Sequence, residues 1–101
     1  MKIYNMESNS GKPIAHQYIL QIGINNHCKY VFQSYKTVIA YTHKNKIVID
    51  NHAEEYSRTT SKYLYMFLRE YCGININNKK ELQKAVENKQ IERQNLKEYE
   101  P

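Results

Sequence analysis

The densest group of reactive side chains lies in residues 56–63, which read YSRTTSKY. If a helix begins here, Ser57 or Thr59 can accept a backbone amide as the helix cap. The free amides of the first turn, with Arg58 and Lys62 beside them, can also hold a phosphate or another anion. A cap alone is the commoner role of such a cluster, and both interpretations stay open. No Gly-rich loop precedes the stretch, so it is not a nucleotide P-loop.

Nucleophilic catalysis would require one of these hydroxyls to lie beside an activating base and an oxyanion site. The histidines are His16, His27, His43 and His52, and their spacing identifies no triad. Cys28 follows His27 directly, but adjacent residues on a strand point to opposite faces. The sequence therefore predicts a protein that is not an enzyme.

Metal binding is equally unsupported by the spacing of possible ligands. His52 follows Asp50 by two positions and would share a strand face with it, but two ligands are too few to define a site. No CxxC pair occurs, which argues against a zinc finger or ribbon. Cys28 and Cys72 are expected to be free thiols. We expect no metal and no cofactor.

Tyrosine is the commonest aromatic residue, with ten Tyr, two Phe and no Trp. Exposed tyrosines are enriched at protein interfaces, and among lysines they can also stack nucleic-acid bases. The codon usage of an AT-rich genome is a third explanation, since Asn, Lys and Ile are abundant as well. The candidate partner-binding residues are Tyr35, Lys36, Tyr56, Arg58, Thr60 and Lys62.

The elements that must position these residues begin with four apolar runs at 14–22, 28–34, 38–42 and 47–50. Short loops at 23–27 and 43–46 separate the first run from the second and the third from the fourth, so each pair is expected to form a hairpin. The pattern predicts a four-stranded antiparallel sheet of two hairpins over residues 14–50. Residues 1–12 are polar and are expected to lie outside the sheet.

Two helices are predicted after the sheet. Tyr63, Phe67 and Tyr71 recur every four residues, as in an amphipathic helix over about 60–72 that packs on the sheet. A second, short polar helix over about 79–89 is indicated by Asn78 as its cap and Glu81 three residues later. The charged tail at 90–101 is expected to fray from Lys97 onward. The fold class is thus α+β, in a single domain over residues 1–101. The expected core is Ile14 or Ala15, Tyr18, Leu20, Phe32, Ile39, Ile47, Ile49, Leu64, Phe67, Leu68 and Tyr71.

The charge is +5 and is distributed unevenly. Residues 1–50 carry six Lys against two acidic residues, whereas residues 51–101 carry nine basic against eight acidic residues. A basic surface favours acidic partners, either a protein or a nucleic acid. No apolar stretch approaches the ~18 residues that span a bilayer, and the first residues do not resemble a secretory signal. We expect a soluble, cytoplasmic protein without membrane contact.

Four pieces of the chain resemble a family of small uncharacterised proteins of bacteriophages and mobile elements. They are MKIYNMESNSGKPIA, FQSY…VIA, the hairpin to IVID, and YSRTTSKYLYMFL, within roughly residues 1–72. The most specific piece is the YSxTTxKY motif that begins at Tyr56. The family often has a Trp just before this motif, where residues 53–55 are Ala-Glu-Glu here. The resemblance implies a phage context and no activity.

Two functions are compatible with these observations. The first is a phage-encoded accessory protein that binds and inhibits a host protein, above all a defence effector such as a CRISPR nuclease, in the host bacterial cytoplasm. The alternative is a nucleic-acid-binding phage protein that uses a basic, Tyr-rich sheet face. The oligomeric state stays open.

Overall fold

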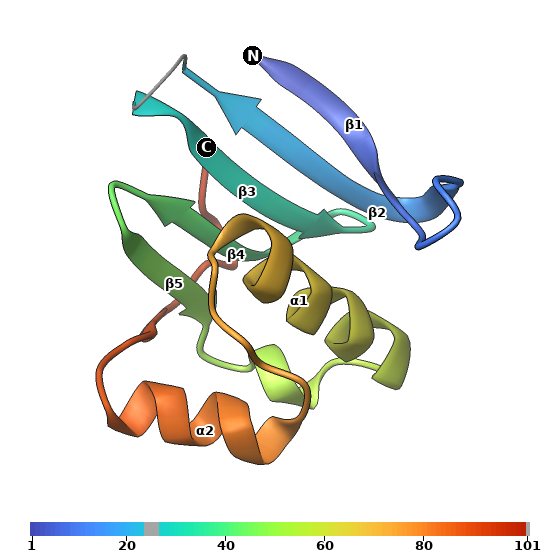
Figure 1. The fold of residues 1–101 in the computed structure, drawn as a ribbon. Coiled ribbons are helices and arrows are strands. Elements are labelled where there is room, and N and C mark those ends of the chain that lie inside the picture. Colours follow the sequence, from blue (N-terminus) through green and yellow to red (C-terminus); the bar gives the residue numbers. More distant parts are fainter. Residues whose placement is uncertain (24–26, 101) are drawn as a thin grey trace.

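A computed structural model, which describes residues 1–23 and 27–100, contains one sheet and two α-helices (Figure 1). The sheet has six strands in the order β1-β2-β3-β4-β5-β6. They are β1 (Lys2–Glu7), β2 (Pro13–Ile22), β3 (Lys29–Ser34), β4 (Thr37–His43), β5 (Lys46–Asp50) and β6 (Glu92–Gln94). Neighbouring strands from β1 to β5 are antiparallel, and β6 is parallel to β5. Residues 24–26 of the expected loop at 23–27 lie outside the described residues.

The class is α+β as predicted, but the predicted four-stranded antiparallel sheet is wrong, because a strand is added at each edge. β1 forms in the polar segment at the start of the chain, where Ile3 pairs with Leu20 and Tyr4 with Ile19. Its local pattern is weak because only Met6 is buried. The ten-residue β2 supplies the backbone partners that make this segment a strand.

The other added strand, β6, lies in the segment at 90–101 that was expected to be a charged tail. Parallel strands need a long crossover connection, and both α-helices lie between β5 and β6 in the chain. Ion pairs hold the short strand: Glu92 to Lys46 at 3.1 Å and Arg93 to Glu54 at 2.7 Å. The sheet is therefore mixed rather than antiparallel.

The helical elements follow β5 as a 3₁₀ turn, η2 (Ala53–Glu55), then α1 (Arg58–Tyr71) and α2 (Lys79–Glu87). The cap of α1 is Ser57, whose Oγ accepts the Thr60 amide at 3.2 Å. The cap of α2 is Asn78, as expected, and its Oδ1 accepts the Glu81 amide at 2.9 Å. The Glu81 carboxylate accepts the amide of residue 77 rather than that of the cap, at 2.7 Å.

The helix-side core lies between the sheet and the two helices. The sheet contributes a row of fully buried residues, with Ile19, Phe32 and Ile49 among them, and Phe67 of α1 stacks on Phe32 at 5.8 Å. Its buried members are Met6, Ile19, Phe32, Ile39, Ala40, Ile49, Ala53, Leu64, Met66, Phe67, Leu68, Ile76, Leu82, Ala85 and Ile91.

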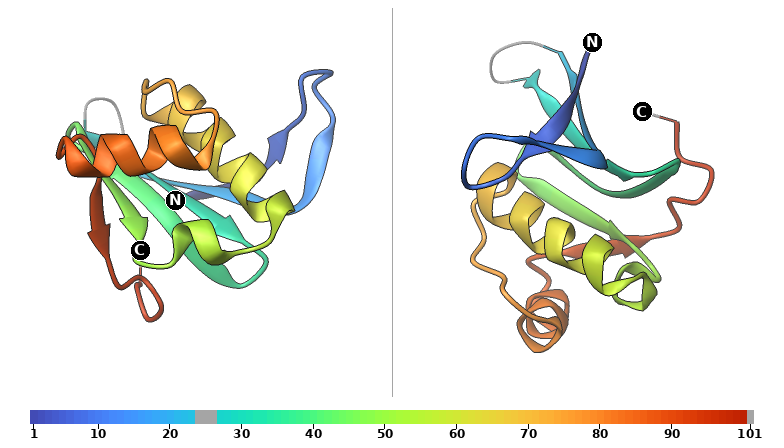
Figure 2. Two further views of the ribbon diagram at one scale, coloured as in Figure 1. Left: turned by 90° about the horizontal axis from the view of Figure 1, so that it is seen from below. Right: turned by 90° about the vertical axis from the view of Figure 1, so that its right-hand side faces the viewer.

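The tail-side core covers the opposite face of the sheet and was not predicted. It is formed by Leu20, Val31, Val38, Val48 and Leu96. The segment after β6 crosses this face, away from α1 (Figure 2, right). Its second anchor is an aromatic stack of Tyr99 on Tyr41, with ring centres 4.9 Å apart. Over residues 97–100 the expected fraying is therefore not seen, because Tyr99 packs on the apolar second face; residue 101 lies outside the described residues.

Asp50 connects this tail to the rest of the chain. The carboxylate is only 3% exposed and accepts the amide of Leu96 at 2.9 Å and the amide of His52 at 3.0 Å. The hydroxyl of Tyr56 donates to it as well, at 3.3 Å. A buried carboxylate is tolerated when several donors satisfy it.

Most of the expected core is buried, namely Leu20, Phe32, Ile39, Ile49, Leu64, Phe67 and Leu68. The expected core residues Ile14, Tyr18, Ile47 and Tyr71 are partly buried, and Ala15 is exposed. A β-bulge between β3 and β4 lets Val38, Ile39 and Ala40 all be buried in succession. Among the described residues, no helix has the length and apolarity needed to cross a membrane.

Replacing Leu96 with Ala is expected to lower the free energy of unfolding by about 2–5 kcal/mol, because it removes a fully buried side chain and leaves a cavity. Glu98→Ala, an exposed position of the same segment, should change the free energy of unfolding by less than about 0.5 kcal/mol. Urea unfolding followed by circular dichroism measures both. Equal stability of the two variants would mean that the tail does not hold the second face.

Candidate functional site

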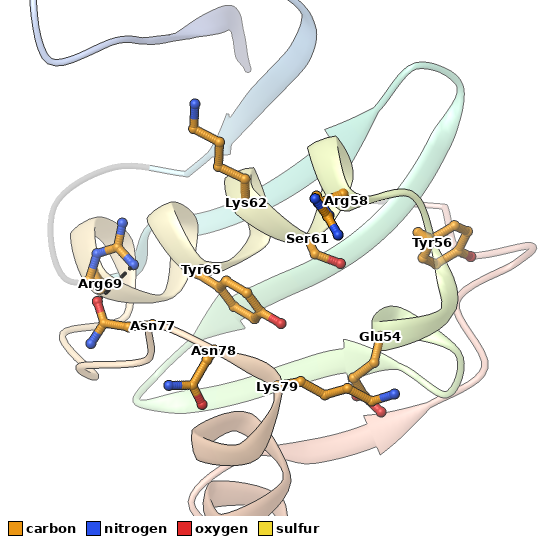
Figure 3. Close-up of a pocket in the computed structure, with 10 residues that line it drawn as sticks. All are labelled: Glu54, Tyr56, Arg58, Ser61, Lys62, Tyr65, Arg69, Asn77, Asn78 and Lys79. Atoms are coloured by element: carbon orange, nitrogen blue, oxygen red, sulfur yellow. Dashed lines mark hydrogen bonds between the residues drawn. The ribbon is translucent and has the colours of Figure 1, made fainter.

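A pocket of about 810 Å³ opens between η2, α1 and the start of α2 (Figure 3). It is lined by Glu54, Tyr56, Arg58, Ser61, Lys62, Tyr65, Arg69, Asn77, Asn78 and Lys79. Each α1 member lies three or four positions from another member, so together they occupy one side of the helix. We call this the cationic pocket, because four cations line it and only one carboxylate.

That one carboxylate is already neutralised. Glu54 forms an ion pair at 2.7 Å with Arg93 of β6, and both side chains are largely shielded from solvent. Arg69 donates to the carbonyl of Ile76 at 2.8 Å and to Oδ1 of Asn77 at 3.3 Å. The bonds of Arg69 are to neutral acceptors, so its charge is not cancelled. The electrostatic potential of the pocket is therefore positive.

Arg58, Lys62 and Lys79 are the cations still available to a ligand. All three are exposed, and none of the ion pairs within the described residues involves them. Arg58 and Lys62 are one helical turn apart, as the spacing predicted. The Lys62 amine, however, lies over the ring of Tyr63, 5.5 Å from its centre, and points away from the pocket in Figure 3. Arg58 and Lys79 are thus the better-placed pair.

Two tyrosines give the pocket apolar surface with hydroxyl groups. Tyr65 projects from α1 toward the start of α2 (Figure 3). Its pKa is raised, first by burial and then by the charge of Glu54. The pKa of Tyr56 is also raised by burial and by Asp50, to which it donates a hydrogen bond. Because both pKa values are raised, both phenols are neutral near physiological pH. Their uncharged rings can then pack against a ligand.

Thr60 is buried and makes contacts within the protein. It is only 6% exposed, and its Oγ1 lies 3.2 Å from Ser34 Oγ and also 3.2 Å from Ser57 Oγ. These bonds attach the first turn of α1 to the end of β3. Of the motif residues proposed from sequence, Thr60 is thus directed into the protein.

The remaining two candidates lie elsewhere. Tyr35 and Lys36 form the turn between β3 and β4, and neither lines the cationic pocket. Tyr35 is 58% exposed and stacks on His16, with ring centres 4.6 Å apart. Of the six residues proposed from sequence, the structure therefore brings together Tyr56, Arg58 and Lys62.

Sequence reasoning missed the other seven residues that line the pocket. Tyr65 and Arg69 could have been found, because they continue the helical face that starts at Arg58. Lys79 and Asn78 could not, since only the packing of α2 near α1 places them at the same pocket.

The described residues hold no group of three His, Cys, Asp or Glu side chains arranged to bind a metal ion. His52 pairs with Glu55, and His16 with the ring of Tyr35. What the cationic pocket offers chemically is positive charge, hydroxyl donors and aromatic surface.

Substitution of Ser57 with Ala is expected to lower the free energy of unfolding by about 0.5–2 kcal/mol, because α1 loses its cap and Thr60 loses a partner. The matched control is Thr59→Ala, at an exposed position that makes no capping bond. Urea titration of both variants measures the difference. A larger loss for Thr59→Ala would contradict this assignment of the cap.

Comparisons with known proteins add a family but no activity. Neither curated proteins nor solved structures give a significant match. Residues 1–85 match a family described as a family of unknown function, DUF8033. This segment runs from β1 into α2, and it contains every residue of the cationic pocket. The chain therefore belongs to the DUF8033 family.

Proposed function

We propose that this protein is a binding module, without catalytic activity, that holds an acidic segment of a partner protein in the cationic pocket. The observation that carries the proposal is the uncompensated charge of Arg58 and Lys79, which line the same pocket as Tyr65. A carboxylate between two cations gains hydrogen bonds and charge, and the ring of Tyr65 offers surface to an apolar neighbour.

A protein segment suits the shape of the pocket. It is formed by two helices and a turn, and its volume of about 810 Å³ exceeds that of a single carboxylate side chain. Interfaces commonly place tyrosine and arginine at their centre, surrounded by polar residues. Asn77 and Asn78, at the exposed start of α2, supply such a polar rim.

The setting we propose is infection of a bacterium by a phage. It is supported by the resemblance of the YSxTTxKY motif to proteins of phages and mobile elements, and by the basic charge of +5. In this setting the protein acts in the host cytoplasm, and it inhibits a host defence effector by occupying an acidic surface. CRISPR nucleases fit this role, because a small basic protein can block an essential acidic patch.

Binding of nucleic acid is the alternative that the same charges permit. A Tyr-rich sheet face is less suited to it, since Tyr41 stacks on Tyr99 and Lys29 lies 4.5 Å from the centre of the Tyr99 ring. The protein's own tail thus occupies the position where a base would stack. Phosphates would instead bind at the cationic pocket.

The proposal predicts that Arg58→Ala combined with Lys79→Ala weakens binding of an acidic peptide by on the order of tenfold, through the loss of two charge contacts. The probe is a fluorescein-labelled peptide rich in Asp, Glu and Tyr, and the measurement is fluorescence anisotropy. The control is Lys80→Ala with Lys84→Ala, two exposed α2 cations that do not line the pocket. This control removes the same charge and should bind like the unmodified protein.

The same titration distinguishes the two functions. Labelled single- and double-stranded DNA and RNA are tested at two salt concentrations, because affinity for phosphates falls steeply with salt. Salt-sensitive binding of nucleic acid without binding of the peptide would replace the proposal with the alternative. Equal loss in both double variants would show that only net charge matters.

The partner itself can be sought by size-exclusion co-migration with purified defence effectors. Co-migration that the Arg58→Ala, Lys79→Ala variant abolishes, together with reduced immunity to phage in cells, is the expected result. Failure to bind any effector, with immunity unchanged, would contradict the proposed inhibition.

A further inference from the structure

The two edges of the sheet differ in a way that points to a second interaction surface. β6 at one edge has three residues, and its Glu92 and Arg93 are both in ion pairs. Short, charged edges resist pairing with another strand. β1 at the other edge has six residues, and among the described strands it pairs only with β2. Its outer row of backbone groups is therefore a template for a further strand.

Exposed apolar side chains gather at the β1 edge. Four large hydrophobic side chains are strongly exposed in the described part of the chain, and three of them are Met1 (79%), Ile3 (61%) and Tyr4 (37%). A strand added to β1 would cover part of this surface. The cationic pocket does not include any residue of β1, so the two surfaces are separate.

A groove of about 550 Å³ runs beside the same strand, on the side of α1. It is lined by Tyr4, Asn5, Glu7, Ser8, Glu70 and Tyr71. Within the described residues, neither of its two carboxylates, Glu7 and Glu70, takes part in an ion pair. A strand that pairs with β1 and carries a cation toward α1 would satisfy Glu70.

We propose that this strand is β1 of a second copy, paired antiparallel around a two-fold axis near Tyr4. Opposed residues of an antiparallel pair point to the same face, so Tyr4 faces Tyr4 of the second copy and Lys2 faces Met6. Tyr4 pairs with Ile19 of the helix-side core, which places Tyr4 and Lys2 on the α1 side of the sheet. Lys2 of each copy then points toward the groove of the other, which Glu70 of α1 lines.

The β1 edge is self-complementary for this pairing. Lys2 is cationic and Glu70, in the groove beside Tyr4, is anionic, so a dyad forms the same charge contact twice. A parallel pair in the same register would instead place Lys2 beside Lys2 of the other copy. One pair of six-residue strands is a small interface, and we expect a dimer that forms in the micromolar range or above.

Charge reversal tests the pairing on the full chain by sedimentation velocity over a range of concentrations. Lys2→Glu and Glu70→Lys should each weaken the dimer by on the order of tenfold, because two attractive contacts become repulsive. An equimolar mixture of these two variants should form a heterodimer as stable as the original dimer, since both contacts are again between opposite charges. Lys80→Glu on α2 is the control for net charge and should dimerise normally.

Arg58→Ala with Lys79→Ala should also dimerise normally, which separates this proposal from the function of the cationic pocket. The proposal is overturned by a protein that stays monomeric at every concentration, which would leave the edge to a strand of a different protein. It is overturned as well if Lys2→Glu does not weaken the dimer, or if mixing the two charge variants does not restore dimer formation.

Discussion

The buried carboxylate of Asp50 is the interaction on which the arrangement of this protein depends most. Removed from water, a carboxylate is costly unless several donors satisfy it. Its donors are the His52 amide, the Tyr56 hydroxyl and the Leu96 amide, and the last of these is distant in the sequence. At this one point the last antiparallel strand ends, the YSxTTxKY motif begins, and the tail turns onto the second face of the sheet.

This junction links the cationic pocket to the C-terminal segment. Tyr56, held by Asp50, lines the pocket, and Leu96, held by the same carboxylate, closes the tail-side core. A second link runs in parallel, since Arg93 of β6 neutralises Glu54 at the pocket wall. The family match ends at residue 85. The pocket residues therefore lie inside the matched segment, whereas Arg93, which neutralises Glu54, lies outside it. In this chain the last segment therefore contributes to both stability and pocket electrostatics.

The local patterns that predicted structure correctly were those with immediate physical causes. The four-residue recurrence from Tyr63 to Tyr71 predicted the helix α1, and Asn78 capped α2 as its position suggested. For the YSRTTSKY stretch, the structure identifies the helix cap. Ser57 is the cap, Thr60 is a buried anchor, and Arg58 faces a pocket. The structure thus confirms the role of this segment as a helix cap, and binding of an anion beside Arg58 stays a prediction.

The sequence by itself determined the α+β class, the two helices with their caps, and the positive charge, because periodicity, capping and composition act over a few neighbouring residues. Tertiary structure alone decided the sheet edges, the burial of both faces and the full lining of the pocket. β1 and β6 have little apolar pattern and exist because β2 and β5 offer them backbone partners. The tail is ordered because the opposite face of the sheet is apolar. Contacts between residues far apart in the chain leave no pattern in the local sequence, so these features could be read only from the tertiary structure.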